Sequence, residues 1–310
     1  MHANHATAPC PVGVIRILRL VMLVCVVLLH GCSSIQFRDI VPPVAAPVAA
    51  VTRPHLALVL GGGATRGFAH VGVIKVLESH GIHPDLVVGT SAGSFVGALY
   101  AGGYHASDLE AIALELEASS IRDVTFPNRG FVKGELLQDF INRKLDNRSL
   151  EELPLPLAIV ATDLTSGKLA VFTKGNTGMA VRASSSIPGI FQPVQIHGQD
   201  YVDGGLVSPV PVNVAREMGA DIVIAVDVSR KPENPAVLAT TGDVLLQTIA
   251  IMEYQIAAKE TAEADVVIRP TLQLSGLQGF DEKQIAISAG ERAAVEALPL
   301  INRLLRTKHP

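Results

Sequence analysis

Two short apolar runs, each stopping at a glycine-rich turn that opens a helical pattern, constrain the fold most strongly. Leu56–Leu60 stops at three consecutive glycines, and Phe68–Ser79 then carries apolar residues at helical spacing. The second run, residues 85–88, stops at Gly89 and also leads into a helical pattern. Short buried strands that alternate with helices are typical of α/β folds. We therefore predict a mostly parallel sheet that is covered by helices on both faces.

Local signals place three further elements. Ser107 and Glu110 predict a capping box at the start of a helix. Residues 195–202 predict a hairpin with His197-Gly198-Gln199 near its turn. Residues 244–264 predict a long helix.

Composition limits the kinds of partner and site that the chain can have. Of its 310 residues, 48% are hydrophobic and 17% are charged, which suffices for a sizeable core. The net charge of −4 and the lack of a Lys/Arg-rich run argue against a nucleic-acid partner. Its three cysteines are Cys10, Cys25 and Cys32, so the rest of the chain can hold no disulfide and no cysteine-based metal site. We expect neither a metal nor a cofactor.

The first 31 residues are predicted to be a signal peptide. Residues 20–29 form an uninterrupted apolar run, which is short for a membrane-spanning helix and has the length of a signal-peptide core. The run ends in Leu29-His30-Gly31-Cys32, which resembles a bacterial lipobox except that His30 replaces a small residue. We expect lipidation at Cys32. An uncleaved signal anchor and an ordinary secretory signal are the alternatives.

Residues 32–54 are predicted to form a tether, and residues 55–310 the globular domain. The stretch 40–54 is rich in Pro, Ala and Val, a composition that forms semi-rigid linkers rather than a packed core. A chain lipidated at Cys32 would be a membrane-anchored lipoprotein of a bacterial cell envelope. The resemblance to bacterial lipoproteins links an acidic residue after the lipidated cysteine to retention in the inner membrane. Ser33 stands at that position and is not acidic, so the periplasmic side of the outer membrane is favoured.

The pentapeptide Gly89-Thr90-Ser91-Ala92-Gly93 has the Gly-x-Ser-x-Gly form of a nucleophilic serine. It lies between a predicted strand and a predicted helix, where such a serine occupies a sharp and strained turn. The helix N-terminus would also favour developing negative charge. An ordinary glycine-rich turn gives the same pattern, so the pentapeptide alone does not decide.

A second glycine-rich turn offers backbone hydrogen-bond donors. It reads Gly61-Gly62-Gly63-Ala64-Thr65-Arg66-Gly67. Two such amides aimed at a carbonyl oxygen would form an oxyanion hole. Arg66 would fix the loop or attract an anionic substrate. A dinucleotide-binding turn does not fit, because the glycine spacing is one residue too long and Asp85 begins the second strand instead of ending it.

The serine needs a base, and Asp203 is the candidate. The histidines that follow Ser91 are His105, His197 and His309, and none stands where a Ser–Asp–His hydrolase places its base. Asp203 follows a predicted strand and precedes Gly204-Gly205, a tight turn that would present its carboxylate at a strand end. A simple turn aspartate is the alternative.

Taken in order, the three motifs resemble those of the patatin-like phospholipases, specifically their compact bacterial branch. They are the glycine-rich turn with Arg66-Gly67, the Gly-Thr-Ser-Ala-Gly pentapeptide and Asp203-Gly204-Gly205. The resemblance covers about residues 56–230. It implies a three-layer α/β/α fold with a mostly parallel central sheet.

The resemblance also implies roles for individual residues. Ser91 would be the nucleophile and Asp203 the base of a dyad that has no histidine. Backbone amides of the oxyanion hole would come from Gly62, Gly63 and Ala64. The turns around these groups would depend on the other motif residues, namely Gly61, Arg66, Gly67, Gly89, Gly93, Gly204 and Gly205.

Together these residues predict a serine acyl-ester hydrolase that cleaves fatty-acyl esters of lipids through an acyl-enzyme. An acyltransferase, with a lipid hydroxyl in place of water, and a non-catalytic lipid-binding envelope lipoprotein are the alternatives. Phospholipid, lysophospholipid, neutral glyceride and thioester substrates all remain open. Residues 121–132, which include Phe126 and Phe131, are a candidate flap near the site, with an ordinary surface loop as the alternative.

Overall fold

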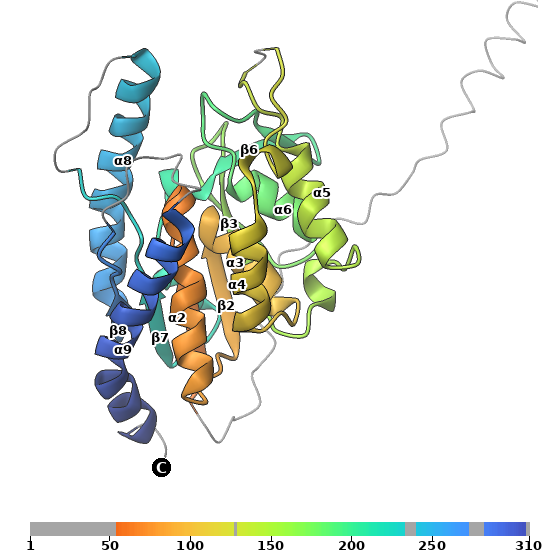
Figure 1. The fold of residues 1–310 in the computed structure, drawn as a ribbon. Coiled ribbons are helices and arrows are strands. Elements are labelled where there is room, and N and C mark those ends of the chain that lie inside the picture. The colour runs from red at the N-terminus through yellow and green to blue at the C-terminus, as the bar shows by residue number, and fades with distance from the viewer. Residues whose placement is uncertain (1–53, 127–128, 233–239, 273–281, 308–310) are drawn as a thin grey trace, which may run out of the picture. The chain divides into compact units, whose positions relative to one another are not determined.

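The computed structural model describes residues 54–126, 129–232, 240–272 and 282–307 (Figure 1). Contacts divide the chain into two units, and every element described below lies in the second, Val48–Pro310. The predicted signal peptide and Cys32 lie outside the described residues, so lipidation stays a prediction. Among the described residues, no helix combines the length and the apolar character needed to cross a membrane.

An eight-stranded sheet forms the centre of the described part of the chain, in the order β5-β6-β3-β2-β1-β7-β8, with β4 paired to β3 beside this path. The pairs β1–β2, β1–β7, β2–β3 and β7–β8 are parallel, whereas β3–β4, β3–β6 and β5–β6 are antiparallel. The strands are β1 (Leu56–Leu60), β2 (Leu86–Thr90), β3 (Leu157–Asp163), β4 (Leu169–Phe172), β5 (Val194–Ile196), β6 (Gln199–Asp203), β7 (Ile222–Val226) and β8 (Val266–Ile268).

Helices cover both faces of the sheet, which confirms the predicted three-layer fold (Figure 1). One layer contains α2 (Phe68–Ser79), α3 (Ala92–Ala101), α4 (Ala106–Glu115), α5 (Glu135–Lys144), α6 (Thr177–Ser184) and α9 (Lys283–Thr307). The other layer contains α7 (Val212–Glu217) and α8 (Thr241–Glu260).

The side chains of β1 point alternately to the two faces of the sheet, which shows why the sheet needs two helical layers. Leu56, Leu58 and Leu60 belong to the core on the α2 side, while Ala57 and Val59 belong to the core on the α7 side. Successive side chains of a strand point to opposite faces, so a strand that is apolar throughout must be covered twice. The same alternation in the other central strands produces one apolar core on each face.

Three local predictions can be compared with the structure. The hairpin is present, and His197 and Gly198 at its turn both have positive φ. The long helix is present but spans Thr241–Glu260, where Thr240 and Asp243 form its capping box. The predicted cap of α4 is wrong: α4 begins at Ala106, and the N–H of His105 donates to Asp108 at 3.1 Å. Asp108 is closer to the start than Glu110 and supplies the capping carboxylate instead.

Candidate active site

Ser91 lies in the sharp turn between β2 and α3, in a backbone conformation that few side chains adopt. Its φ is 52° and its ψ is −121°, and a positive φ is unfavourable for a residue with a Cβ. Its N–H donates to the Ser184 hydroxyl at 2.8 Å, and the Ser94 hydroxyl donates to its carbonyl oxygen at 2.7 Å. These two bonds hold the strained turn from both sides. Ser184 lies outside the three main motifs, and its supporting role was not predicted from the sequence.

Two glycines allow this turn to close. A Cβ on Gly89 would lie 2.7 Å from the Gly93 carbonyl oxygen, and a Cβ on Gly93 would overlap the Leu60 carbonyl oxygen. Backbone atoms cannot turn aside as a side chain can, so only glycine fits at either position. The glycine requirement of the motif therefore follows from the packing of α3 against β1.

Strand register brings the candidate base to the serine. Thr90 of β2 pairs with Val160 of β3, and the next residue, Ala161, pairs with Asp203 at the end of β6. The Ser91 hydroxyl donates to Asp203 Oδ2 at 2.7 Å, although the two residues are 112 positions apart. The structure thus brings together the two residues that the motifs single out.

Asp203 is buried and firmly held. Only 3% of its surface is exposed. The Gly205 N–H donates to its Oδ1 at 2.8 Å, and the Thr162 hydroxyl donates to its carbonyl oxygen at 2.8 Å. Burial raises the pKa of Asp203 to about 6, while the hydrogen bonds from Gly205 and Ser91 oppose that rise. Such a carboxylate is a stronger base than a solvated aspartate and is still ionised at neutral pH.

The glycine-rich turn at residues 61–67 lies against Ser91, but only some of its backbone N–H groups are free to donate hydrogen bonds. The Gly62 N–H donates to the Pro209 carbonyl oxygen at 2.9 Å, so this amide is occupied. This corrects the expectation for Gly62, whose amide binds the loop to the distant segment that contains Pro209. Among the described residues, the amides of Gly63 and Ala64 donate to no protein acceptor. They are the two available donors in this turn.

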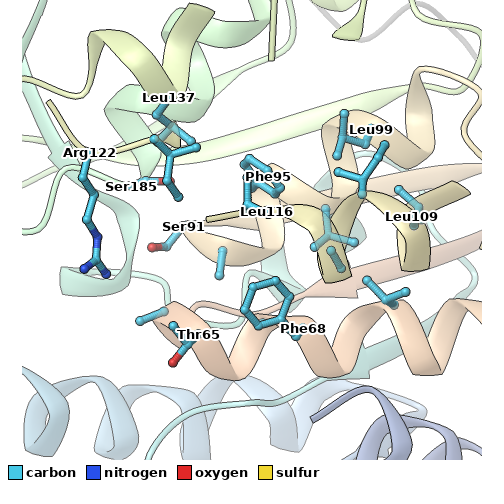
Figure 2. Close-up of a pocket in the computed structure, with 18 of the residues that line it drawn as sticks. Thr65, Phe68, Ser91, Phe95, Leu99, Leu109, Leu116, Arg122, Leu137 and Ser185 are labelled. Atoms are coloured by element: carbon cyan, nitrogen blue, oxygen red, sulfur yellow. The ribbon is translucent and has the colours of Figure 1, made fainter. Parts of the chain in front are cut away.

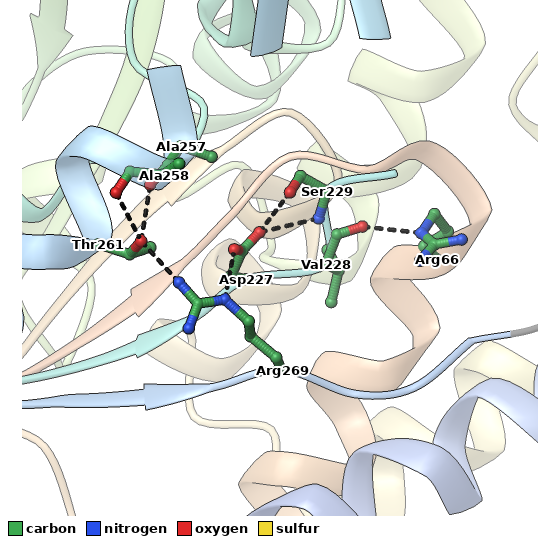
Figure 3. A network of polar contacts seen from close by, with 8 residues as sticks. All are labelled: Arg66, Asp227, Val228, Ser229, Ala257, Ala258, Thr261 and Arg269. Atoms are coloured by element: carbon green, nitrogen blue, oxygen red, sulfur yellow. Dashed lines mark hydrogen bonds and ion pairs between the residues drawn. The ribbon is translucent and has the colours of Figure 1, made fainter. Parts of the chain in front are cut away.

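Arg66 holds the glycine-rich turn to the segment that follows β7 (Figure 3). Its Nε donates to the Val228 carbonyl oxygen at 2.9 Å. The preceding residue, Asp227, accepts from the Ser229 N–H and hydroxyl and from Arg269 Nε at 3.1 Å. Arg269 also donates to the Thr261 hydroxyl at 2.8 Å. These bonds support the loop-fixing role of Arg66.

An apolar cavity extends from Ser91 between the helices of the α2 layer (Figure 2). It encloses about 910 Å³ of empty space, part of which is open to solvent. Ser91 lies toward one end with Arg122, and Leu99 and Leu109 lie toward the other (Figure 2). The apolar lining includes Val71, Phe95, Leu99, Leu109, Ala113 and Leu137. The apolar part of this cavity, away from Ser91 and Arg122, suits a hydrocarbon chain.

The histidines of the described residues lie apart from the Ser91–Asp203 pair. Within the described residues, none forms a hydrogen bond with Ser91 or Asp203. His70 is fully buried, with Nε2 2.8 Å from the Gly61 carbonyl oxygen, and burial lowers the pKa of His70 to about 4. It is a neutral support for the glycine-rich turn. The described residues also contain no group of three or more His, Cys, Asp or Glu side chains arranged to hold a metal.

A second carboxyl, from Glu253 on α8, faces the same turn as Asp203. A Cβ on Gly205 would lie 3.0 Å from Glu253 Cδ and 3.1 Å from Asp203 Oδ1, so Gly205 separates the two carboxyls. Burial and the negative charge of Asp203 raise the pKa of Glu253 to about 8, and Arg230 opposes this rise. At neutral pH Glu253 is therefore protonated, and the pair carries one negative charge. No sequence motif marks Glu253, because only tertiary packing brings α8 to the dyad.

Comparison with known proteins agrees with this geometry. A family model described as patatin-like phospholipase matches residues 58–216, just over half of the chain. The chain belongs to the patatin-like phospholipase family. Membership supports the hydrolysis of lipid acyl esters as the activity of the patatin-like domain. The matched residues include Ser91, Asp203 and both glycine-rich turns, whereas Glu253 lies beyond them.

Individual relatives share this domain but differ in total length. Patatin-like phospholipase domain-containing protein 6 of Mus musculus is 39% identical over 203 residues, which cover 63% of this chain and 15% of that protein. An uncharacterised NTE family protein of Mycobacterium tuberculosis is 34% identical over 197 residues, which cover 63% of this chain and 54% of that protein. The chain thus matches about a seventh of the mouse protein and about half of the mycobacterial one.

A solved structure supports the fold. VipD of Legionella pneumophila aligns with a TM-score of 0.53 and 14% sequence identity, over 84% of this chain and 68% of that one. At this identity the likeness concerns the fold alone.

Proposed function

We propose that the protein hydrolyses fatty-acyl esters of lipids with Ser91 as the nucleophile and Asp203 as the general base. The observation that carries this proposal is the 2.7 Å hydrogen bond from the Ser91 hydroxyl to the buried Asp203 carboxylate, at one end of an apolar cavity. A serine that donates to a base, next to unoccupied backbone donors, has the parts needed for acyl transfer.

In the first half of the reaction, the Asp203 carboxylate takes the hydroxyl proton as Ser91 Oγ bonds to the ester carbonyl carbon. The carbonyl oxygen becomes an oxyanion, which the amides of Gly63 and Ala64 stabilise. The bond to the leaving alcohol then breaks, and that alcohol takes the proton from Asp203. An acyl-enzyme on Ser91 remains.

In the second half, Asp203 takes a proton from water as the water oxygen attacks the acyl carbon. The resulting oxyanion collapses, the fatty acid leaves, and the proton returns to Ser91. Asp203 therefore acts in turn as base and acid. Protonated Glu253 keeps a second negative charge away from the oxyanion at neutral pH.

The elevated pKa of Asp203 predicts the acid limb of the pH profile. Only the ionised carboxylate can accept the serine proton, and its pKa is raised from 3.8 to about 6. We expect kcat/KM for a neutral soluble ester to fall tenfold per unit as pH drops below about 6. Initial rates between pH 4.5 and 8, with circular dichroism to verify the fold at each pH, measure this. An acid limb centred at the ordinary aspartate value would contradict the assignment of Asp203 as the base.

The apolar cavity predicts selectivity for acyl-chain length. Ala113 lines the cavity on α4, and a phenylalanine there would fill space that a long acyl chain needs. For Ala113→Phe we expect kcat/KM on a C16 ester to drop about tenfold. Turnover of an acetate ester should stay close to that of the wild type, because a two-carbon acyl group needs little of the cavity. Equal losses on both esters would show that the acyl chain does not occupy this cavity.

A further inference from the structure

Exposed apolar side chains stand on a segment that also lines the cavity. Val124 is 79% exposed, Phe126 is 92% exposed and Phe131 is 55% exposed. The same segment contributes Ile121 and Arg122 to the cavity lining. Side chains of this size are seldom left so exposed together unless they contact another surface.

The first turns of α8 add to this surface from the other side of the site. Val244 is 50% exposed and Leu245 is 43% exposed. A Cβ on Gly189 would lie 2.8 Å from a Leu245 methyl group, and a Cβ on Gly130 would overlap the Phe191 backbone. The turn at 187–191 therefore lies between the two apolar groups, and its Ile187 and Phe191 line the cavity. Figure 1 shows the start of α8 and the segment before α5 at the same end of the sheet.

We call Val124, Phe126, Phe131, Val244 and Leu245 the apolar rim. Two cationic side chains close to the rim form ion pairs. Arg129 forms an ion pair with Asp200 at 2.5 Å, and Lys133 forms one with Glu135 at 3.7 Å. The rim therefore offers apolar contact rather than a cationic patch for anionic headgroups.

We propose that the apolar rim docks the domain on a lipid surface, so that an acyl chain passes from the bilayer into the cavity without crossing water. This inference rests on the proposed function, which requires a lipid substrate. A bilayer is favoured over a protein partner because the segments that adjoin the rim also line the cavity, through Ile121 and Arg122 before α5 and through Ile187 and Phe191 in the turn against Leu245. A protein seated there would close the entrance, whereas a bilayer would supply the substrate through it. Insertion of apolar side chains into the interface provides the attraction.

Vesicle binding by an inactive protein tests this proposal. The fragment Val48–Pro310 carrying Ser91→Ala is mixed with phosphatidylcholine vesicles. This fragment lacks the predicted lipid anchor and cannot hydrolyse the vesicles by way of Ser91, so only docking is measured. We expect Phe126→Ser combined with Leu245→Ser to weaken co-sedimentation at least about tenfold. Val295→Ser is the matched control, because Val295 is 53% exposed on α9, outside the rim. Binding should also change little between low and high salt, because salt screens attraction between charges and does not screen the insertion of apolar side chains.

Parent-like vesicle binding by the double variant would overturn the proposal. The proposal would also be overturned if the parent fragment did not bind vesicles but formed a dimer, and the double variant disrupted that dimer. The rim would then be an interface with a second copy of the chain. The double variant should still hydrolyse a soluble short-chain ester at the wild-type rate, because neither residue lines the cavity. If the active fragment shows no Ser91-dependent turnover of that ester, the proposed function is wrong. The vesicle measurement with the Ser91→Ala fragment would still test whether the rim binds a lipid surface.

Discussion

Ser91→Ala is expected to lower kcat/KM for a lipid ester by about a thousandfold or more. The substitution removes the oxygen that attacks the carbonyl carbon, and water alone must then react in a site built around Ser91. The fold should survive, because the two bonds that hold the turn use the backbone of Ser91. Fatty-acid release from mixed phospholipid vesicles and from a soluble ester measures the loss.

Two further variants complete this comparison. Asp203→Asn should be similarly inactive, because an amide keeps the size of the side chain and cannot accept the serine proton. Ser107→Ala is the matched control, since Ser107 is an exposed serine on α4, and it should retain full activity. Undiminished ester hydrolysis by Ser91→Ala would remove Ser91 as the nucleophile. If vesicles alone stay intact while the soluble ester is cleaved by way of Ser91, the chemistry holds and phospholipid is not the substrate.

Gly93→Ala is expected to lower the free energy of unfolding by about 3 kcal/mol or more, or to prevent folding. The new Cβ would overlap the carbonyl oxygen of Leu60, an atom in a central strand that pairs on both sides. Neither α3 nor β1 can move without opening the core. Urea denaturation followed by circular dichroism measures the change.

Gly242→Ala is the matched control for that substitution. Gly242 lies in the first turn of α8, and the nearest atom to its Cβ would be the Thr240 hydroxyl oxygen at 3.6 Å. Alanine there should be neutral or raise the free energy of unfolding by about 0.5 kcal/mol, because it restricts the unfolded chain. A Gly93→Ala protein as stable as Gly242→Ala would mean that the turn is not packed as described.

Local patterns predicted most of the sheet and the motif positions. Phe68–Ser79 is a helix over the predicted residues, because its apolar spacing and both boundaries are signalled by nearby residues. The resemblance to the patatin-like phospholipases implied the Ser91–Asp203 pair, and the structure joins the two side chains by a hydrogen bond. The start of α4 was misplaced because Ser107 with Glu110 and His105 with Asp108 are competing capping pairs, and local sequence does not rank them.

Features that depend on contacts between distant segments could not be predicted. The Gly62 amide was expected to face the substrate, but the Pro209 carbonyl oxygen accepts its hydrogen bond from a turn 147 residues away in the chain, which no local pattern reveals. Glu253 reaches the dyad only through the packing of α8 on the turn at Gly205. The antiparallel pairing of β6 with β3, which sets the Ser91–Asp203 distance, is likewise a property of the assembled sheet.

The most direct test of the dyad is the intact mass of the active fragment after reaction with an alkyl fluorophosphonate. Ser91 Oγ would displace fluoride and retain the phosphonyl group. We predict one added group per chain, located on the Ser91 peptide, absent from Ser91→Ala and formed much more slowly by Asp203→Asn. No labelling of the folded wild-type fragment, or labelling at another residue that persists in Ser91→Ala, would contradict the account.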